Sequence, residues 1–336
     1  MLGRYSLVFV SALCFLSTHS LAQDAKVTLE WVKPSLSSIP SARYGAGIAY
    51  DLATSSTVLL GGSNTDGNTY LNDTWVWKNG WVQQSPANSP SPRTTNMAYD
   101  ATTGTFMLFG GYNGSEALGD TWTWDGVTWT QQFPPLSPSP RTNNGMTFDA
   151  ATGTILLFGG AGNGLGDGDV FNDTWEWNGK TKTWVHLFPA SSPSPRRTTI
   201  AYDRATGNVV LFGGDTEQYG CCDTFYGDTW TWNGVTWTEQ FPSSAPTART
   251  LNSLSYYPEA GTSVLFGGYS TPGVGLGDTW TWNGAIWTEI QTTFSPSPRW
   301  DQSVVFDPNS KSLVLFGGVV TGSSTVGDTW SLILHH

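Results

Sequence analysis

A single phrase recurs six times along the 336-residue chain: an arginine, an apolar run ending in Gly-Gly, and the tripeptide Asp-Thr-Trp. The arginines stand about 50 residues apart, at Arg43, Arg93, Arg141, Arg196, Arg249 and Arg299. The glycine pairs begin at Gly61, Gly110, Gly159, Gly213, Gly267 and Gly317, and the tripeptides begin at Asp73, Asp120, Asp173, Asp228, Asp278 and Asp328. A repeat of this length predicts an array of like structural units packed side by side.

Each repeat divides into four short strands. In the third copy, "NNGMTFD" is the first strand, "DAATGT" is a turn, and "ILLFGG" is the second strand. The third strand is the alternating "DTWTW" type of segment, whose period of two places both indoles on one face. An Asn-Gly or Asp-Gly turn then leads to a fourth strand with its own tryptophan. Four antiparallel strands per repeat are typical of one blade of a β-propeller.

The two ends of the chain complete this pattern. The last repeat stops at "DTWSLILHH", with three strands, and "VTLEWVKP" near the N-terminus reads as a fourth strand with no blade before it. Trp31 stands twelve residues before Arg43, the same interval that separates the fourth-strand tryptophan from the next arginine in the other repeats. We therefore expect an all-β fold: a six-bladed β-propeller over residues 23–336, with its last blade closed by the N-terminal strand.

The chain contains 18 tryptophans, and 17 of them fall in repeat positions. This regularity favours packing between blades over a set of separate sugar-binding platforms. Each buried indole removes about 150–250 Å² from water. We therefore expect the tryptophans to stabilise the ring rather than to bind ligand.

The succession of a first strand, "LFGG", a polar loop, an aromatic strand, a short turn and Trp resembles the kelch repeat. The resemblance covers residues 27 to 333 and implies a propeller of the galactose oxidase and kelch superfamily. Two departures are the Trp-x-Trp pair, where kelch repeats more often carry a single Tyr, and Tyr257, which replaces the aspartate after the first strand of the fifth repeat.

The first 22 residues have the features of a secretory signal peptide: Arg4, an apolar run from Leu7 to Leu16, and small residues at Ser20 and Ala22. The apolar run is too short to span a bilayer. We therefore expect a secreted protein that is extracellular, periplasmic or on the cell surface, without membrane insertion. The net charge of −11 argues against a nucleic-acid partner, because phosphate contacts need clustered Lys and Arg. We expect a monomer.

The loops of a propeller built in this way differ between its two faces. The turns within each strand pair are short, whereas the loops after Gly-Gly vary in length and lie with the Pro-rich connectors on the other face. A fixed scaffold with variable loops on one side suits ligand binding. The six arginines start the innermost strands on that face. They either form a carboxylate-binding ring, as arginines at this place do in some kelch domains, or pair with the Asp-Thr-Trp aspartates as framework; the regular spacing favours the framework.

Residues that break the repeat are the better ligand-binding candidates. Trp300 is the only tryptophan outside the repeat positions, and it lies between Arg299 and Asp301 at the expected mouth of the central channel. Trp300 is either a stacking platform for a ligand or a packing residue, and Arg299 and Asp301 beside it are ligand-binding candidates as well. Tyr112, in the loop after the second Gly-Gly, is a further candidate.

The loop of the fourth repeat, "DTEQYGCCDTFYGDTW", is the longest and holds Cys221 and Cys222. In an oxidising compartment we favour a strained disulfide between these neighbours, against free thiols or a bond to another chain. Such a ring would present an apolar surface beside Tyr219, Phe225 and Tyr226, so Tyr219, Tyr226 and both cysteines are ligand-binding candidates.

We expect no metal and no cofactor. The third-repeat loop offers the oxygen donors Asp167, Asp169 and Asn172, but a solvated turn is the simpler interpretation. The copper-radical oxidases of the superfamily need two histidine ligands, and His186 is the only histidine in the propeller body. No nucleophile elbow, zinc motif or phosphate loop is present.

Two functional hypotheses follow. The first is an exported, non-catalytic propeller that binds an extracellular protein or a glycan on its long-loop face. The alternative is a small-molecule enzyme, such as a sugar isomerase or hydrolase, with carboxylates and arginines at the channel mouth. A purely structural spacer of the cell envelope is a third possibility.

Overall fold

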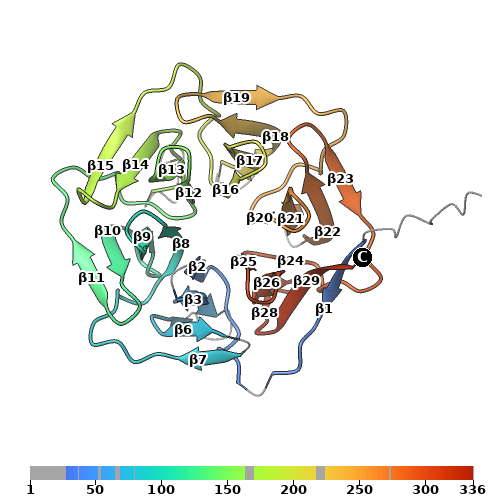
Figure 1. Cartoon of the computed structure of the whole chain (residues 1–336), viewed down its shortest axis with the longest axis horizontal. Helices are drawn as coiled ribbons and strands as arrows, with labels where there is room; N and C mark the ends of the chain where they lie inside the picture. Colours follow the sequence, from blue (N-terminus) through green and yellow to red (C-terminus); the bar gives the residue numbers. More distant parts are fainter. Residues whose placement is uncertain are drawn as a thin grey trace, which may run out of the picture.

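In a computed structural model, residues 28–335 are described except for 37, 52–53, 65–68, 79, 163–169, 217–223 and 272–273. The described residues form β-strands, turns and loops, and no α-helix occurs among them. The strands stand around a central axis, and the view down this axis shows sheets arranged in a ring (Figure 1).

Six four-stranded antiparallel sheets account for most of the described strands. From the axis outward, the first three sheets contain β2 (Gly47–Asp51), β3 (Ser56–Leu60), β6 (Thr74–Trp77) and β7 (Trp81–Gln83); β8 (Thr94–Asp100), β9 (Thr105–Tyr112), β10 (Ala117–Trp124) and β11 (Trp129–Gln132); β12 (Gly145–Asp149), β13 (Thr154–Phe158), β14 (Thr174–Asn178) and β15 (Thr183–Leu187). The predicted division of each repeat into four strands is confirmed in these sheets.

The other three sheets have the same strand order. They contain β16 (Ile200–Asp203), β17 (Asn208–Asp215), β18 (Phe225–Trp232) and β19 (Trp237–Gln240); β20 (Ser253–Tyr257), β21 (Thr262–Thr271), β22 (Val274–Trp282) and β23 (Trp287–Ile290); β25 (Ser303–Asp307), β26 (Ser312–Phe316), β29 (Thr329–His335) and β1 (Thr28–Val32). In the last of these, β1 pairs antiparallel with β29, and Trp31 lies opposite Leu332.

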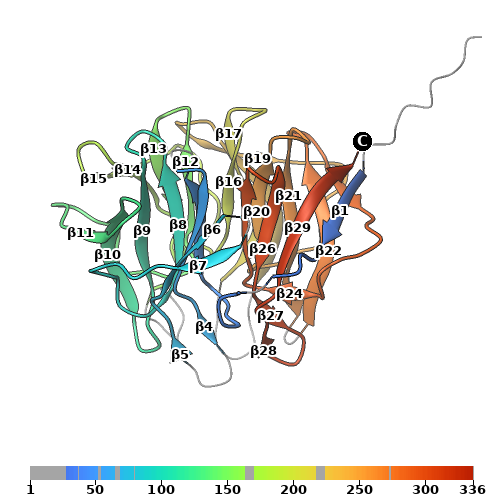
Figure 2. The ribbon, with the colours of Figure 1, turned by 60° about the horizontal axis from the view of Figure 1, so that its bottom comes forward.

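Short strands extend the loops on one side of the ring. They are β4 (Ser63–Asn64) and β5 (Thr69–Tyr70), and β24 (Arg299–Trp300), β27 (Val319–Val320) and β28 (Ser324–Thr325). They lie together on one side of the molecule (Figure 2), which we call the long-loop face. The tight-turn face is the opposite side, where the turns between first and second strands lie, at residues 100–105, 149–154, 203–208, 257–262 and 307–312.

The core lies between neighbouring sheets. The second strands, such as β13 with its sequence TILLF, are almost fully buried because apolar side chains cover both of their faces. The fourth-strand tryptophans are buried as well, and rings pack across sheet boundaries, as Phe158 and Trp237 do with centroids 5.0 Å apart. The expected packing of tryptophans between sheets is present at these positions.

The Gly-Gly pairs bring neighbouring repeats into close contact. Gly110 has φ +67°, and a Cβ added there would lie 2.5 Å from the carbonyl oxygen of Arg141 in the next sheet. The amide of Gly111 donates a hydrogen bond to that same oxygen at 2.9 Å. Only glycine permits both the positive φ and the approach of the two backbones, which explains why the pair recurs in each repeat.

Candidate functional site

The six repeat arginines are part of the framework. All six are at most 1% exposed, and each pairs with the aspartate of its own Asp-Thr-Trp. Arg141 donates to Asp173 Oδ1 at 2.6 Å and Oδ2 at 2.9 Å, and also to the carbonyls of Ser139 and Gly159 at 3.0 Å each. Bidentate geometry of this kind leaves the guanidinium few free donors. These arginines therefore have a structural role in the framework, and they do not form an open carboxylate-binding ring.

Arg299, which we predicted to be a ligand-binding residue, has the same kinds of partner as the other five arginines. Its Nη1 lies 2.6 Å from Asp328 Oδ1, and its Nε and Nη1 donate to the carbonyls of Ser297 and Gly317, each at 3.0 Å. Burial raises the pKa of Asp328, but the hydrogen bonds and charge of Arg299 outweigh it and bring the pKa to about 2. Arg299 thus holds the sheet together beneath Trp300 rather than facing a ligand.

The rim of the channel on the long-loop face is built from one pair of residues per sheet. In each pair, a backbone bridge joins the residue after the arginine to a residue that directly follows Gly-Gly. The pairs are Tyr44 with Ser63, Thr94 with Tyr112, Thr142 with Ala161, Arg197 with Asp215, Thr250 with Tyr269, and Trp300 with Val319. The predicted candidates Trp300 and Tyr112 therefore both lie on this rim: Trp300 is the residue after the arginine of its pair, and Tyr112 is the residue after Gly-Gly of another.

Aromatic side chains gather at two parts of the rim. Trp300 packs against Tyr269, with ring centroids 5.2 Å apart, and Tyr269 lies 6.0 Å from Phe225. On the other part, Tyr70 meets Tyr112 edge to face at 5.9 Å. Burial and the neighbouring tyrosines raise the pKa of Tyr70 to about 12, so its hydroxyl stays protonated and can donate. All five rings are partly exposed.

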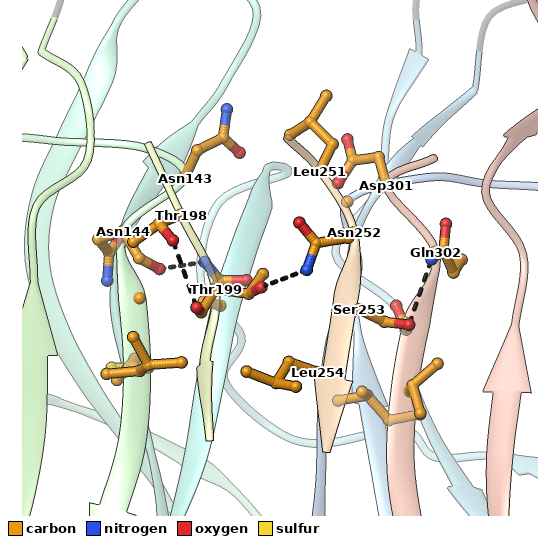
Figure 3. A pocket seen from close by; sticks show the side chains of 18 of the residues that line it. Asn143, Asn144, Thr198, Thr199, Leu251, Asn252, Ser253, Leu254, Asp301 and Gln302 are labelled. Atoms are coloured by element: carbon orange, nitrogen blue, oxygen red, sulfur yellow. Dashed lines mark hydrogen bonds between the residues drawn. The ribbon is translucent and has the colours of Figure 1, made fainter. Parts of the chain in front are cut away.

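A polar cavity of about 130 Å³ lies inside the rim, around the axis (Figure 3). Its lining comes from the starts of the six first strands, and most of its side chains are amides and hydroxyls: Asn96, Asn143, Asn144, Thr198, Thr199, Thr250, Asn252, Ser253, Gln302 and Ser303. Asn252 donates to the Thr199 hydroxyl at 3.3 Å, and Gln302 donates to Ser253 at 3.2 Å. The buried Nδ2 of Asn144 and Oε1 of Gln302 have no partner among the described residues.

Asp301 contributes a carboxylate to the lining of this cavity. Figure 3 shows it beside Leu251 and above Gln302. Burial raises the pKa of Asp301 to about 6, although the charge of Arg197 acts in the opposite direction. Arg197 is itself bound to Asp215, whose Oδ1 also accepts from the Thr250 hydroxyl at 3.0 Å. Asp301 is therefore the one carboxyl group among the described residues that line the cavity, and its pKa lies closer to neutrality than that of an ordinary aspartate.

An extra residue shapes the cavity in four of the six sheets. Gly45, Asn143, Leu251 and Asp301 all have φ between 51° and 61°, and the corresponding segments after Arg93 and Arg196 are one residue shorter. Backbone hydrogen bonds link these positions across sheets: Gly45 donates to Asp301 at 3.0 Å, and Asp301 donates to Leu251 at 2.8 Å. The left-handed conformation turns the Asn143, Leu251 and Asp301 side chains to the mouth of the cavity. For Leu251 it is strained.

The repeat architecture agrees with the similarity to known proteins. A family model described as "KLHDC2/KLHL20/DRC7 Kelch-repeats domain" matches residues 17–198 and 133–318. The chain belongs to the kelch-repeat family. No match to a curated protein was found. Among solved structures, this kelch-repeat chain is similar to the one titled "Structure of YjhT", with a TM-score of 0.66 and 12% identity over 90% of this chain and 99% of that chain. At this identity the likeness concerns the fold.

The remaining predicted positions of the kelch-repeat chain are distributed as follows. The ring of Tyr226 lies over the guanidinium of Arg196, 3.8 Å from its centroid to Cζ, so this tyrosine covers the framework. Tyr219, Cys221 and Cys222 lie outside the described residues, as do Asp167 and Asp169. No cluster of three or more His, Cys, Asp or Glu side chains suited to a metal occurs in the described part of the chain. Nor does that part contain a helix with the length and apolar character needed to cross a membrane.

Sequence reasoning missed two sets of residues in this kelch-repeat fold. The first is the amide and hydroxyl lining of the cavity, which follows the arginines at positions that look like ordinary strand starts. The second is a set of aromatic residues at the other end of the channel: Tyr50, Tyr99, Phe148, Tyr202, Tyr256 and Phe306. Their signal was present, because five of the six directly precede the aspartate that ends the first strand, as in "AYD" and "TFD".

Proposed function

We propose that this protein is a non-catalytic binding propeller that recognises a ligand on the long-loop face, at the rim and the cavity beneath it. Kelch-repeat propellers commonly serve as binding scaffolds, and a protein is one possible ligand. The observation that carries our choice is the combination of partly exposed rings, Trp300 with Tyr269 and Tyr70 with Tyr112, around a cavity lined by amides and hydroxyls. This combination favours a glycan.

The size and chemistry of the cavity support a sugar residue. A cavity of about 130 Å³ has room for one small ring or side chain. Amides and hydroxyls can both donate and accept, as sugar hydroxyls do. Aromatic faces on the rim can pack against the apolar face of a second sugar residue. We therefore expect a terminal residue to enter the cavity and its neighbour to lie on Trp300.

We further infer that the ring has six blades and that β1 closes the sixth. Support comes from the pairing of β1 with β29 and from the inner strands β2, β8, β12, β16, β20 and β25, each of which contacts its two neighbours around the axis. The Gly318 amide also donates to the Arg43 carbonyl at 2.9 Å, which repeats between the last and first sheets the contact that Gly111 makes with Arg141.

We propose that the protein is exported, as a monomer, after removal of residues 1–22, and that it belongs to the wider galactose oxidase and kelch superfamily. The support for export is the composition of the N-terminal segment. Mass spectrometry of the protein recovered outside the cytoplasm tests this, because the proposal requires a mature chain that starts near Gln23.

Binding to glycan and peptide arrays, followed by calorimetric titration of each hit, tests the ligand. Trp300→Ala should weaken glycan binding about fivefold or more, since an aromatic platform contributes about 1 kcal/mol or more to contacts of this kind. The matched control is Phe241→Ala, which removes an 85% exposed ring outside the rim and should leave affinity unchanged. Equal affinity of wild type and Trp300→Ala would contradict the proposed site. If the protein bound only peptides, the proposed ligand would be a protein and not a glycan.

An enzyme is the second candidate function, and Asp301 is the observation that favours it. Its raised pKa of about 6 and its position in a confined cavity suit general acid or base catalysis of a proton transfer, as in a sugar isomerase or hydrolase. Turnover of any glycan hit, followed by NMR, separates the two functions. Turnover that Asp301→Asn abolishes while binding persists would establish the enzyme; binding without turnover supports the binding propeller.

A further inference from the structure

The tight-turn end of the channel is a second cavity, separate from the site proposed above. Its volume is about 580 Å³, within the range of small-molecule sites. Both cavities share a belt of six apolar side chains, one per sheet: Ile48, Met97, Met146, Ile200, Leu254 and Val304. This belt lies at the inner end, or floor, of the second cavity, which we call the aromatic funnel. Asp301 lines only the first cavity.

Each sheet contributes one aromatic residue to the wall of the funnel. These are Tyr50, Tyr99, Phe148, Tyr202, Tyr256 and Phe306, near the ends of the innermost strands. Tyr99, Phe148, Tyr202 and Phe306 also pack against the apolar clusters between sheets, which fixes their positions. All six rings remain partly exposed. The wall is therefore a preformed apolar surface, with hydroxyls on four of its rings.

The fifth sheet shows how one of these positions is held. Its turn lacks the usual aspartate, and Tyr257 stands there instead, fully buried, with its hydroxyl donating to the carbonyl of Lys311 at 2.9 Å. The preceding Tyr256 consequently keeps the same place on the wall as its counterparts. The departure in the fifth repeat thus preserves the funnel.

Arg204 is the only charged residue in the funnel lining among the described residues. The other seven described arginines are paired with aspartates, whereas Arg204 is exposed and forms no ion pair or hydrogen bond with the described part of the chain. Its charge acts on two wall residues: burial raises the pKa of Tyr202 and of Tyr256, and Arg204 opposes the rise in both. The nearby carboxylate of Asp203 raises both pKa values further, and that of Asp149 also raises the pKa of Tyr202. A free guanidinium therefore lies near two protonated phenols at the edge of an apolar cavity.

We propose that the aromatic funnel binds a small aromatic carboxylate, with its ring against the tyrosine and phenylalanine wall and its carboxylate on Arg204. One guanidinium matches one carboxylate, which it can hold with two parallel hydrogen bonds. The Tyr202 and Tyr256 hydroxyls are further donors. A phosphate dianion would keep an uncompensated charge in a protein of net charge −11. An unsubstituted sugar would leave its hydroxyls against the apolar floor without partners.

Calorimetric titration of the full mature chain with 3-phenylpropanoate tests this proposal. The comparison ligands are 3-phenylpropanamide, which lacks the charge, propanoate, which lacks the ring, and phenyl phosphate. We expect the acid to bind about tenfold or more tightly than the amide, because hydrogen bonds to charged groups are the stronger ones. Propanoate should bind far more weakly than the acid, since it gains nothing from the wall. Phenyl phosphate should bind more weakly than the carboxylate.

Two variants locate the binding. Arg204→Gln should remove the preference for the acid over the amide, and Arg204→Lys should keep part of it. Lys180→Gln is the matched control, because it removes an exposed cation from a turn of the same face outside the funnel lining. Trp300→Ala should have no effect, which distinguishes this site from the glycan site. The proposal is overturned if wild type binds acid and amide equally, if Arg204→Gln retains the preference, or if Lys180→Gln and Arg204→Gln have equal effects.

Discussion

The indole N–H of Trp31 donates to the hydroxyl of Thr279 at 3.0 Å, across the boundary between the sheet of β1 and the sheet of β22. The same bond recurs between the fourth-strand tryptophan of each sheet and the Asp-Thr-Trp threonine of the preceding one. The other pairs are Trp81 with Thr329, Trp129 with Thr74, Trp184 with Thr121, Trp237 with Thr174, and Trp287 with Thr229, at 2.9–3.1 Å. The repeated threonine therefore joins neighbouring sheets, and Trp31 takes part from the far end of the sequence.

Thr279→Val should destabilise the protein by about 1–3 kcal/mol, because it leaves the buried indole N–H of Trp31 without an acceptor. Thr281→Val, two residues along the same strand, removes a hydroxyl whose bond to the Thr288 carbonyl is exposed, and should cost less than about 0.5 kcal/mol. Urea unfolding followed by tryptophan fluorescence compares the two. Equal stability of both variants would mean that the Trp31 contact contributes nothing.

The sheets were predictable from the sequence because every residue that builds them recurs in register. The arginine pairs with the tripeptide aspartate, the glycine pair contacts the next repeat, and the tryptophan contacts the previous one. Each of these contacts therefore requires one characteristic residue or residue pair in every repeat. The interval from Trp31 to Arg43 matches the interval in the other repeats, so it identified the N-terminal segment as a fourth strand. The role of the tripeptide threonine was not foreseen, because a threonine in a strand has no distinctive pattern.

The sites were less predictable because they depend on where the repeat changes by one residue or one side chain. Asp301 was identified beside Trp300, but the left-handed residues Asn143 and Leu251 were not, since neither residue type marks such a conformation in a sequence. The aromatic funnel escaped attention for the opposite reason. Its residues recur in each repeat, and a recurring aromatic residue is interpreted as part of the core until its exposure is known.

Acid should weaken the framework pairs. The pKa values of Asp73, Asp120, Asp173, Asp278 and Asp328 are lowered on folding, because the arginine hydrogen bonds and charge outweigh the effect of burial. A lowered folded-state pKa gives stability that is present above the unfolded value near 4 and is lost as the pH falls towards the folded value, about 2 for Asp328. Urea unfolding at pH 7, 4 and 3 should show a steep loss below pH 4.

Asp328→Asn isolates one of these pairs. At pH 7 it should cost on the order of 3 kcal/mol, since it leaves the buried Arg299 without its counter-charge. As the pH falls from the unfolded value near 4 to the folded value of about 2, the difference from wild type should shrink, because protonation of the aspartate then favours the unfolded wild-type chain. A cost that is independent of pH would point to lost packing instead.

Asp301→Asn should act in the opposite sense. The folded-state pKa of Asp301 is raised to about 6, so the wild-type protein bears a cost for the buried charge that is absent below the unfolded value near 4 and complete above pH 6. The neutral asparagine removes that cost, which is about 3 kcal/mol. The variant should therefore match wild type at pH 4 and unfold at higher urea concentration at pH 8. Lower stability at pH 8 would show that a partner compensates the charge.

Leu251→Gly should stabilise the fold and weaken glycan binding. Leucine at φ +51° bears a steric cost of about 1–2 kcal/mol that glycine avoids, partly offset by the lost packing of a half-buried side chain. We expect a net gain of about 0.5–1 kcal/mol in urea unfolding. Leu251 stands at the cavity mouth beside Asp301, so the shortened wall should loosen the bound sugar several-fold in titrations. A variant that is both more stable and unimpaired in binding would mean that the strain serves no ligand.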